Sequence, residues 1–264
     1  RYTQKGVTYT RRYIASYPDN VIAMKLRAAQ PQQLTMRISL ALPDNRTRRD
    51  ITIDNRLIVS GTLHSNGLAY ETHIGVHHKG GTVRVKNGVI TVQQADEVTL
   101  YVVAGTNYAQ SYPTYRGALP HARLNKAITE AMAISFDELQ QRHQADYHEL
   151  FNRVSFDIGQ TAPSLSTPQL LAQYGKGNAN SDRYLEATYF QFGRYLLIAS
   201  SRAGSLPANL QGVWNQSTTP PWNADYHVNI NLQMNYWLAE TTNLPELMTP
   251  YFEFVDSLVK PGSI

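Results

Sequence analysis

The sequence predicts an α+β protein in which an antiparallel β part precedes a helical part. From Tyr2 to about Ala109 the apolar residues recur with a period of two, which is typical of half-buried strands. After a connector with Pro and Gly at residues 112–120, the period becomes that of a helix. The 264 residues are 42% apolar and 10% aromatic, which is enough to form packed cores in one large domain or two ordinary ones.

At least six strands are predicted in residues 1–110, in a sandwich-like arrangement. Apolar and polar residues alternate clearly in residues 22–26 and 34–40, and the segment EVTLYVV at 97–103 adds another strand. The sequence Lys86-Asn87-Gly88 separates two further alternating runs, which is a strong hairpin signal. Other turns are expected at Pro43-Asp44-Asn45, Asp54-Asn55 and Lys79-Gly80-Gly81.

Residues 111–160 are predicted to form a helical linker. Leu124, Ile128 and Ala131 recur on one helical face, and Ser135 and Glu138 form a capping box that begins a second helix. Residues 157–181 are rich in Gly, Ser, Asn and Pro and are expected to be loop, with a short helix near 168–173.

Residues 161–264 are predicted to contain further helices. One apolar stripe steps by four and three residues, and we expect it to face other helices; it consists of Leu185, Tyr189, Phe192, Leu196 and Ala199. A last helix begins at Thr249-Pro250. Because nothing here completes a sheet or a closed helical barrel, and the chain lacks an initiator Met, we expect an internal part of a longer protein.

Composition excludes several classes of function. The net charge of +4 is spread along the chain without an aromatic-interleaved basic patch, so no nucleic-acid partner is expected. The absence of Cys excludes disulfides, thiolate metal sites and a cysteine nucleophile. No run approaches the roughly 18 apolar residues of a membrane span. The spacing of His64, His73, His77 and His78 fits no metal-site geometry, so we expect ordinary surface histidines, no metal and no cofactor.

The stretch TPPWNADYHVNINLQMNYW, residues 219–237, contains the sharpest candidate site. His227, Asn229 and Asn231 alternate between two tryptophans without any Lys or Arg. On extended backbone these three side chains would share one face, with Val228, Ile230 and Leu232 packing on the other. We interpret the polar face as the wall of a binding site, although an edge strand with a wet polar face would give the same pattern.

Two tryptophans flank amide-rich loops. The segment LPANLQGVWN, residues 206–215, places neutral donors and acceptors beside Trp214, and Trp222 follows two prolines. Such a surface suits an uncharged, hydroxyl-rich ligand, but loop amides that satisfy their own backbone would look the same. If the reaction were glycoside hydrolysis, two carboxylates would be needed, and Asp225 and Glu240 are the acids nearest the triplet.

These motifs, taken in order, resemble glycoside hydrolase family 95. The resemblance rests on LPANLQGVWN, on PPW at 220–222, on NIN at 229–231 followed by MNYW at 234–237, and on YFQFGRYL at 189–196. It implies the later part of an N-terminal β-sandwich for residues 1–110, a helical linker for 111–160, and the opening helices of an (α/α)6 barrel for 161–264. It also implies an inverting α-L-fucosidase that acts on Fucα1-2Gal ends, or an α-L-galactosidase.

The resemblance assigns roles to individual residues. Asn229 and Asn231 resemble the amide pair that orients the attacking water and supports an aspartate base, and His227 resembles a sugar-contacting position that favours fucose over galactose. The general acid (a Glu) and the base (an Asp) of the family lie beyond Ile264, which overrules Asp225 and Glu240 as the pair.

The resemblance further implies a fucosylated oligosaccharide as substrate and the rest of the parent chain as a partner. A secreted or periplasmic location is expected, although Arg1-Tyr2-Thr3 does not begin a signal peptide. Two alternatives remain open: a non-catalytic carbohydrate-binding or scaffold module, and a glycoside phosphorylase of the same plan. The oligomeric state is not predicted.

Overall fold

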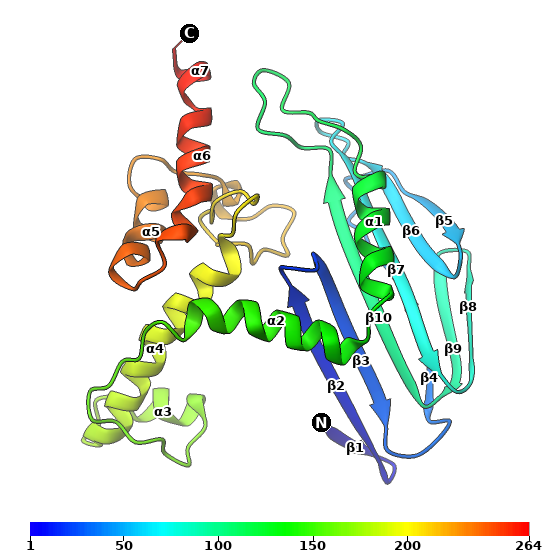
Figure 1. The fold of residues 1–264 in the computed structure, drawn as a ribbon, viewed down its shortest axis with the longest axis horizontal. Helices are drawn as coiled ribbons and strands as arrows, with labels where there is room; N and C mark the ends of the chain where they lie inside the picture. Colours follow the sequence, from blue (N-terminus) through cyan, green and yellow to red (C-terminus); the bar gives the residue numbers. More distant parts are fainter. Residues whose placement is uncertain (264) are drawn as a thin grey trace. The chain divides into compact units, whose positions relative to one another are not determined.

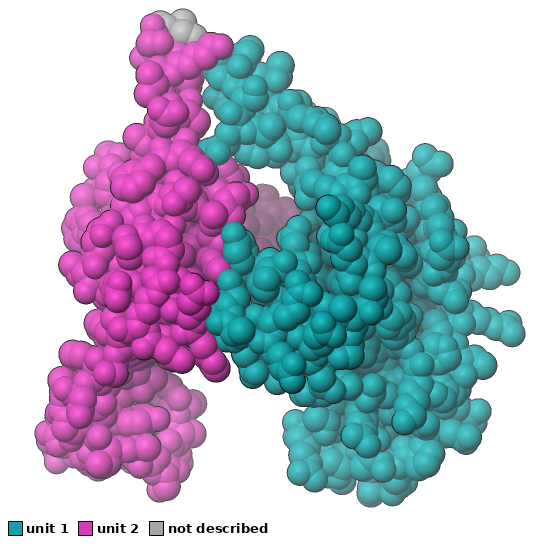
Figure 2. Space-filling model, in the orientation of Figure 1, with its two compact units in different colours: residues 1–146 teal, residues 147–264 magenta. Residues whose placement is uncertain are grey.

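The structure is a computed structural model that describes residues 1–263, and it divides into two compact units (Figures 1 and 2). Unit 1 comprises residues 1–146 and unit 2 comprises residues 147–264. The boundary falls inside one helix, within the predicted linker of residues 111–160. Among the described residues, no helix combines the length and the apolar character that crossing a bilayer requires.

Unit 1 contains two antiparallel sheets. The larger has the strand order β1-β2-β3-β10-β7-β6-β5 and the smaller the order β4-β9-β8. The strands are β1 (Tyr2–Gln4), β2 (Val7–Ser16), β3 (Val21–Ala28), β4 (Leu34–Ser39), β5 (Arg49–Ile53), β6 (Arg56–Thr62), β7 (Ala69–Lys79), β8 (Thr82–Lys86), β9 (Val89–Ala95) and β10 (Glu97–Thr106). The antiparallel β prediction is confirmed.

The predicted turns have the backbone that their residues favour. Asn87 and Gly88 both adopt positive φ (50° and 73°) in the tight turn that joins β8 to β9, and this confirms the predicted hairpin. Asp54 and Asn55 also have positive φ, in the turn between β5 and β6. These left-handed conformations fix the register of each strand pair.

The two sheets bury a shared apolar core. Leu57, Val59 and Ile74 of the larger sheet pack in the same cluster as Ile90 and Val92 of the smaller sheet, each at most 5% exposed. The unit is therefore a sandwich, because the facing apolar sides of the two sheets bury each other.

The opposite face of the larger sheet is covered by a helix. Helix α1 (His121–Met132) packs its predicted face, which includes Leu124 and Ile128, against Tyr101 and Val103 of β10 (Figure 1). Helix α2 (Phe136–Phe151) then begins where predicted, since the Ser135 hydroxyl accepts a hydrogen bond from the Glu138 backbone N–H at 3.1 Å.

Unit 2 is helical within the described residues. Its elements are α3 (Thr167–Gln173), α4 (Ala179–Ser200), η1 (Pro221–Ala224), α5 (Asn231–Thr241), η2 (Pro245–Met248), α6 (Thr249–Ser257) and α7 (Val259–Gly262). One buried cluster joins the end of α2, α4, α5 and η2; it contains Leu150, Leu197, Ile198, Leu232, Tyr236, Ala239, Leu244 and Leu247.

Helix α4 buries a different face from the one predicted. Tyr189 is 77% exposed and Phe192 is 49% exposed, whereas Ala187, Arg194 and Ile198 are buried. At about 100° per residue these two sets lie on opposite sides of the helix. The stripe of Leu185 to Ala199 is therefore on the exposed side of α4 within the residues that the structure describes, and the expectation that it faces other helices stays a prediction.

Candidate functional site

The predicted site residues lie in a loop, a turn and the start of a helix, not in an extended strand. Residues 228–230 form a turn, and α5 begins at Asn231. The Leu232 N–H donates to the His227 carbonyl at 3.0 Å, and this bond closes the turn. Because the backbone is not extended, the predicted alternation of a polar and a packed face is wrong.

The turn leaves its apolar residues exposed along with its amides. Val228 and Ile230 are 47% and 43% exposed, although they were expected to pack. Asn229 and Asn231 are both exposed as well. Both amides therefore reach solvent on this unit and could contact a ligand or a water molecule.

His227 is held by an acid that lies two residues before it. The distance from His227 Nε2 to Asp225 Oδ1 is 3.0 Å, and both side chains are partly exposed. With Nε2 occupied by the carboxylate, Nδ1 is the ring atom left to meet a ligand.

The amide-rich loop is fixed by α5. The side-chain amide of Asn235 donates to the carbonyl oxygens of Ala208 and Asn209 at 3.3 and 3.0 Å. Asn209 and Gly212 also exchange two backbone hydrogen bonds. Sequence reasoning missed the role of Asn235, because only its place on the inner side of α5 shows that it reaches the loop.

Trp214 and Trp222 differ in exposure and in what holds each side chain in place. Trp214 is 48% exposed and its ring lies directly against Gly212, where any Cβ would meet the indole. Trp222 is 73% exposed and has a left-handed φ of 47° within η1. A bulky residue seldom adopts that backbone, so the chain holds this indole in an unusual and accessible position.

Tyr236 of α5 connects three segments of unit 2. Its hydroxyl oxygen accepts from the Ala208 N–H at 2.9 Å and lies 2.7 Å from Ser201 Oγ, and Ser201 in turn donates to the Leu247 carbonyl. Burial raises the pKa of Tyr236, although its hydrogen bonds with Ser201 and Ala208 oppose the shift. The hydroxyl therefore stays protonated at neutral pH.

We expect Tyr236→Phe to destabilise unit 2 by about 1–2 kcal/mol, because the buried Ala208 N–H loses its acceptor. All three tryptophans lie in unit 2, so urea unfolding followed by their fluorescence reports this unit. Tyr189→Phe removes an exposed hydroxyl and should leave the midpoint unchanged. Equal midpoints for Tyr236→Phe and the unmodified chain would show that the hydroxyl does not hold the loop.

Asp225 and Glu240, the two acids nearest the triplet, lie on different elements. Glu240 is the penultimate residue of α5, whereas Asp225 precedes the turn that begins the helix. At 1.5 Å per residue, Glu240 lies about 13 Å along the axis from Asn231. The exclusion of these two acids as the pair remains a prediction from the family resemblance.

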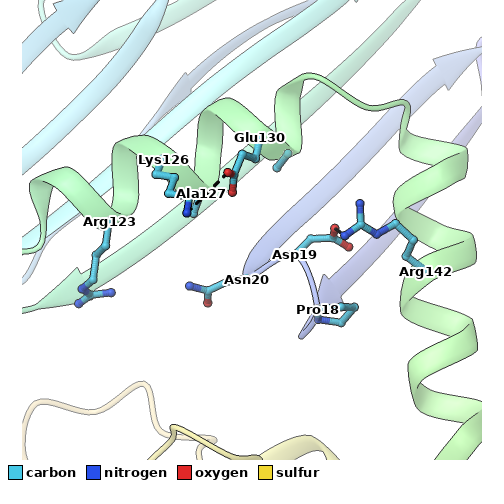
Figure 3. Close-up of a pocket in the computed structure, with 9 residues that line it drawn as sticks. Pro18, Asp19, Asn20, Arg123, Lys126, Ala127, Glu130 and Arg142 are labelled. Carbon is cyan, nitrogen blue, oxygen red and sulfur yellow. Dashed lines mark ion pairs between the residues drawn. The ribbon is translucent and has the colours of Figure 1, made fainter.

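A pocket of about 460 Å³ lies in unit 1, and none of the predicted site residues lines it (Figure 3). It is lined by the turn before β3, by one side of α1 and by Arg142 of α2. Arg142 and Asp19 form an ion pair at 2.9 Å, and Asp19 also accepts from Ser16 Oγ. These groups are mutually satisfied, so the pocket gives no reason to relocate the site.

Comparison with known proteins identifies the family. The profile of the "Glycosyl hydrolase family 95 catalytic domain" matches residues 135–264. An "Alpha-L-fucosidase 2" of Arabidopsis thaliana is 30% identical and covers 99% of this chain. A "Probable alpha-fucosidase A" of Aspergillus niger is 32% identical and covers 95%. This chain belongs to glycoside hydrolase family 95.

Two further comparisons concern the fold of this family 95 chain, including its β part. Residues 1–111 match the "Glycosyl hydrolase family 65, N-terminal domain". A solved structure titled "Putative kojibiose phosphorylase from human microbiome" shares 10% identity with a TM-score of 0.51, over 80% of this chain and 28% of that one. At this identity the likeness concerns the fold only. The chain spans about a third of the length of the curated relatives named above (34% and 33%).

Proposed function

We propose that the complete protein is an inverting α-L-fucosidase that releases terminal fucose, mainly α1,2-linked to galactose. The observation that carries the proposal is the family 95 match across the segment that contains the exposed Asn229 and Asn231. The relatives named as fucosidases support the choice of sugar. A secreted or periplasmic location is part of the same proposal.

Asn229 and Asn231 orient the attacking water in this mechanism. An inverting glycosidase needs a water molecule on the face of the sugar opposite the leaving oxygen. One amide carbonyl accepts a hydrogen bond from that water, while the other amide donates to the aspartate, which removes one proton from the water as its oxygen attacks the anomeric carbon. The base aspartate and the acid glutamate lie outside residues 1–264 in this proposal.

His227, Trp214 and Trp222 bind the sugar. Asp225 Oδ1 lies 3.0 Å from His227 Nε2, which leaves Nδ1 to meet a sugar hydroxyl. The exposed indole faces suit the apolar side of a sugar ring, including the methyl group of fucose. An uncharged set of this kind matches an uncharged substrate.

The remaining helices of an (α/α)6 barrel would cover the exposed stripe of α4. Tyr189 and Phe192 lie on the side of α4 opposite its buried face, and a helix that is apolar on two sides is typical of an inner layer. This placement supports the proposal that residues 161–264 are the opening of such a barrel.

The proposal is tested by measuring fucose release from 2'-fucosyllactose. The complete protein should release fucose without added phosphate, and NMR should detect the β-anomer first, because inversion converts the α-linkage. The 264-residue chain should be inactive, since it lacks both carboxylates. First appearance of the α-anomer would contradict inversion, phosphate-dependent cleavage would indicate a phosphorylase, and glycan binding without cleavage would indicate a binding module.

His227→Thr is expected to shift preference from the L-fucoside to the L-galactoside. The smaller side chain leaves room for the 6-hydroxyl that distinguishes galactose from fucose, and such a change is worth about 10- to 200-fold in specificity. The measurement is the ratio of kcat/KM for the two aryl glycosides. An unchanged ratio would remove His227 from substrate selection.

A further inference from the structure

Three side chains of unit 1 bring donor atoms together beside the larger sheet. Glu71 Oε1 lies 2.5 Å from His73 Nε2 and 2.7 Å from His121 Nδ1. The three donor atoms all lie within 4.8 Å of one another. The His73 side chain is fully buried, that of Glu71 is 13% exposed and that of His121 is 57% exposed. The prediction that His73 is a surface histidine is therefore wrong.

The fold itself assembles this cluster. Glu71 and His73 are alternate residues of β7 and share the face that α1 covers, whereas Ile74 of the same strand points into the sandwich core. His121 is the first residue of α1, which packs on β7 and β10. Gly75 has no side chain, which lets Met132 approach the strand closely.

The position of α1 along the sheet is fixed independently of the cluster. Arg56 of β6 donates to Asn125 Oδ1 and to Thr129 Oγ1, at 3.2 and 3.0 Å. Because these bonds hold the helix to the sheet, His121 stays above Glu71 even when its own contact is broken. The donor set is therefore preorganised.

We propose that Glu71, His73 and His121 form a binding site for one divalent transition-metal ion, with Zn²⁺ as the best match. Two imidazoles and one carboxylate are a donor set that Zn²⁺ accepts, with a fourth position for water on the exposed side of His121. Ca²⁺ and Mg²⁺ prefer oxygen ligands and match the two nitrogens poorly. The ion joins α1 to β7 and stabilises unit 1, whether or not the fucosidase proposal holds.

Binding requires a small rearrangement. Donor atoms around Zn²⁺ lie about 2.0–2.2 Å from the ion, so Glu71 and His121 must separate from their present hydrogen-bond distance. His121 is exposed and has room to move outward. The Nδ1 atom of His73 is buried and has no partner among the described residues.

The unpartnered Nδ1 of His73 limits the affinity of the proposed site for Zn²⁺. While Nε2 donates its proton to Glu71, Nδ1 carries only a lone pair; when Nε2 binds the ion, the ring proton moves to Nδ1. Outer partners of ligating histidines contribute about 10- to 100-fold in affinity. We therefore expect weaker binding than at a zinc site whose histidines are fully supported.

The test uses the complete protein after treatment with a chelator and dialysis. Calorimetric titration with Zn²⁺ should show a site that is weakened at least 10-fold by His121→Ala and by Glu71→Gln. Co²⁺ should give visible absorption bands in the unmodified protein that both variants lose. Zn²⁺ should raise the unfolding temperature of the unmodified protein more than that of either of these two variants.

The matched control is His64→Ala, which removes another exposed histidine of unit 1 and should bind Zn²⁺ like the unmodified protein. His121 is exposed and α1 is held by Arg56, so the His121→Ala variant is expected to fold. Equal Zn²⁺ affinity and stoichiometry for His121→Ala and the unmodified protein would overturn the proposal, as would the absence of any bound ion.

Discussion

Asn231→Ala in the complete enzyme is expected to lower kcat by about 100-fold or more while KM changes little. The amide acts on the water in the transition state, so its loss affects turnover more than substrate binding. Asn229→Asp should have a similar effect, because a carboxylate there lacks the N–H donor and repels the aspartate base. The measurement is steady-state hydrolysis of 2'-fucosyllactose.

The control for both variants is Asn152, an exposed asparagine of unit 2 that lies just after α2. Asn152→Ala and Asn152→Asp make the same chemical changes outside the proposed site and should leave kcat unchanged. Since Asn229 and Asn231 are exposed, their variants should also unfold at the same urea concentration as the unmodified protein. A full kcat in either variant would remove the amide pair from the mechanism.

The β part was predictable because its local signals agree with its tertiary packing. The strand pattern at residues 34–40 and the turn at Asn87-Gly88 are each sufficient to fix a strand or a reversal. The sheet order was not predictable, since β10 lies between β3 and β7 by long-range pairing that no local pattern records.

The candidate site residues were predicted from the sequence, but the prediction of an extended backbone for them was wrong. Alternation at His227, Asn229 and Asn231 suggested a strand, yet the stretch from Asn231 onward has a helical core contact at Leu232 and Tyr236. A short run of alternating residues does not distinguish a strand from a turn that enters a helix. The proposed role of the two amides requires that they reach solvent, and it does not require an extended backbone.

The cluster of Glu71, His73 and His121 could not be predicted from the spacing of these residues in the sequence. His121 is far from His73 along the chain, and only the packing of α1 on β7 brings them together. A search for metal ligands within the β part therefore finds histidines without a site. The same argument holds for Arg194 of α4, which donates to two carbonyls of another helix, α2.

Arg194 of α4 holds the end of α2 from inside unit 2. It is fully buried and donates to the carbonyls of Phe151 and Leu150 at 2.7 and 3.0 Å. These carbonyls belong to the last turn of α2, where no intrahelical donor is available. Burial lowers the pKa of Arg194, but guanidinium groups remain charged in proteins, so the cation also meets the negative end of the helix dipole.

We expect Arg194→Ala to destabilise unit 2 by about 3 kcal/mol or more, because it removes the guanidinium donor from two carbonyls and creates a cavity. Arg194→Lys keeps the charge, but an ammonium group lacks the planar fork that reaches both carbonyl oxygens. The loss in the free energy of unfolding should therefore be intermediate. Lys176→Ala removes an exposed cation and should stay within about 0.5 kcal/mol of the unmodified chain. Urea unfolding followed by tryptophan fluorescence measures all three, and a stable Arg194→Ala variant would show that water replaces the guanidinium at the end of α2 without loss.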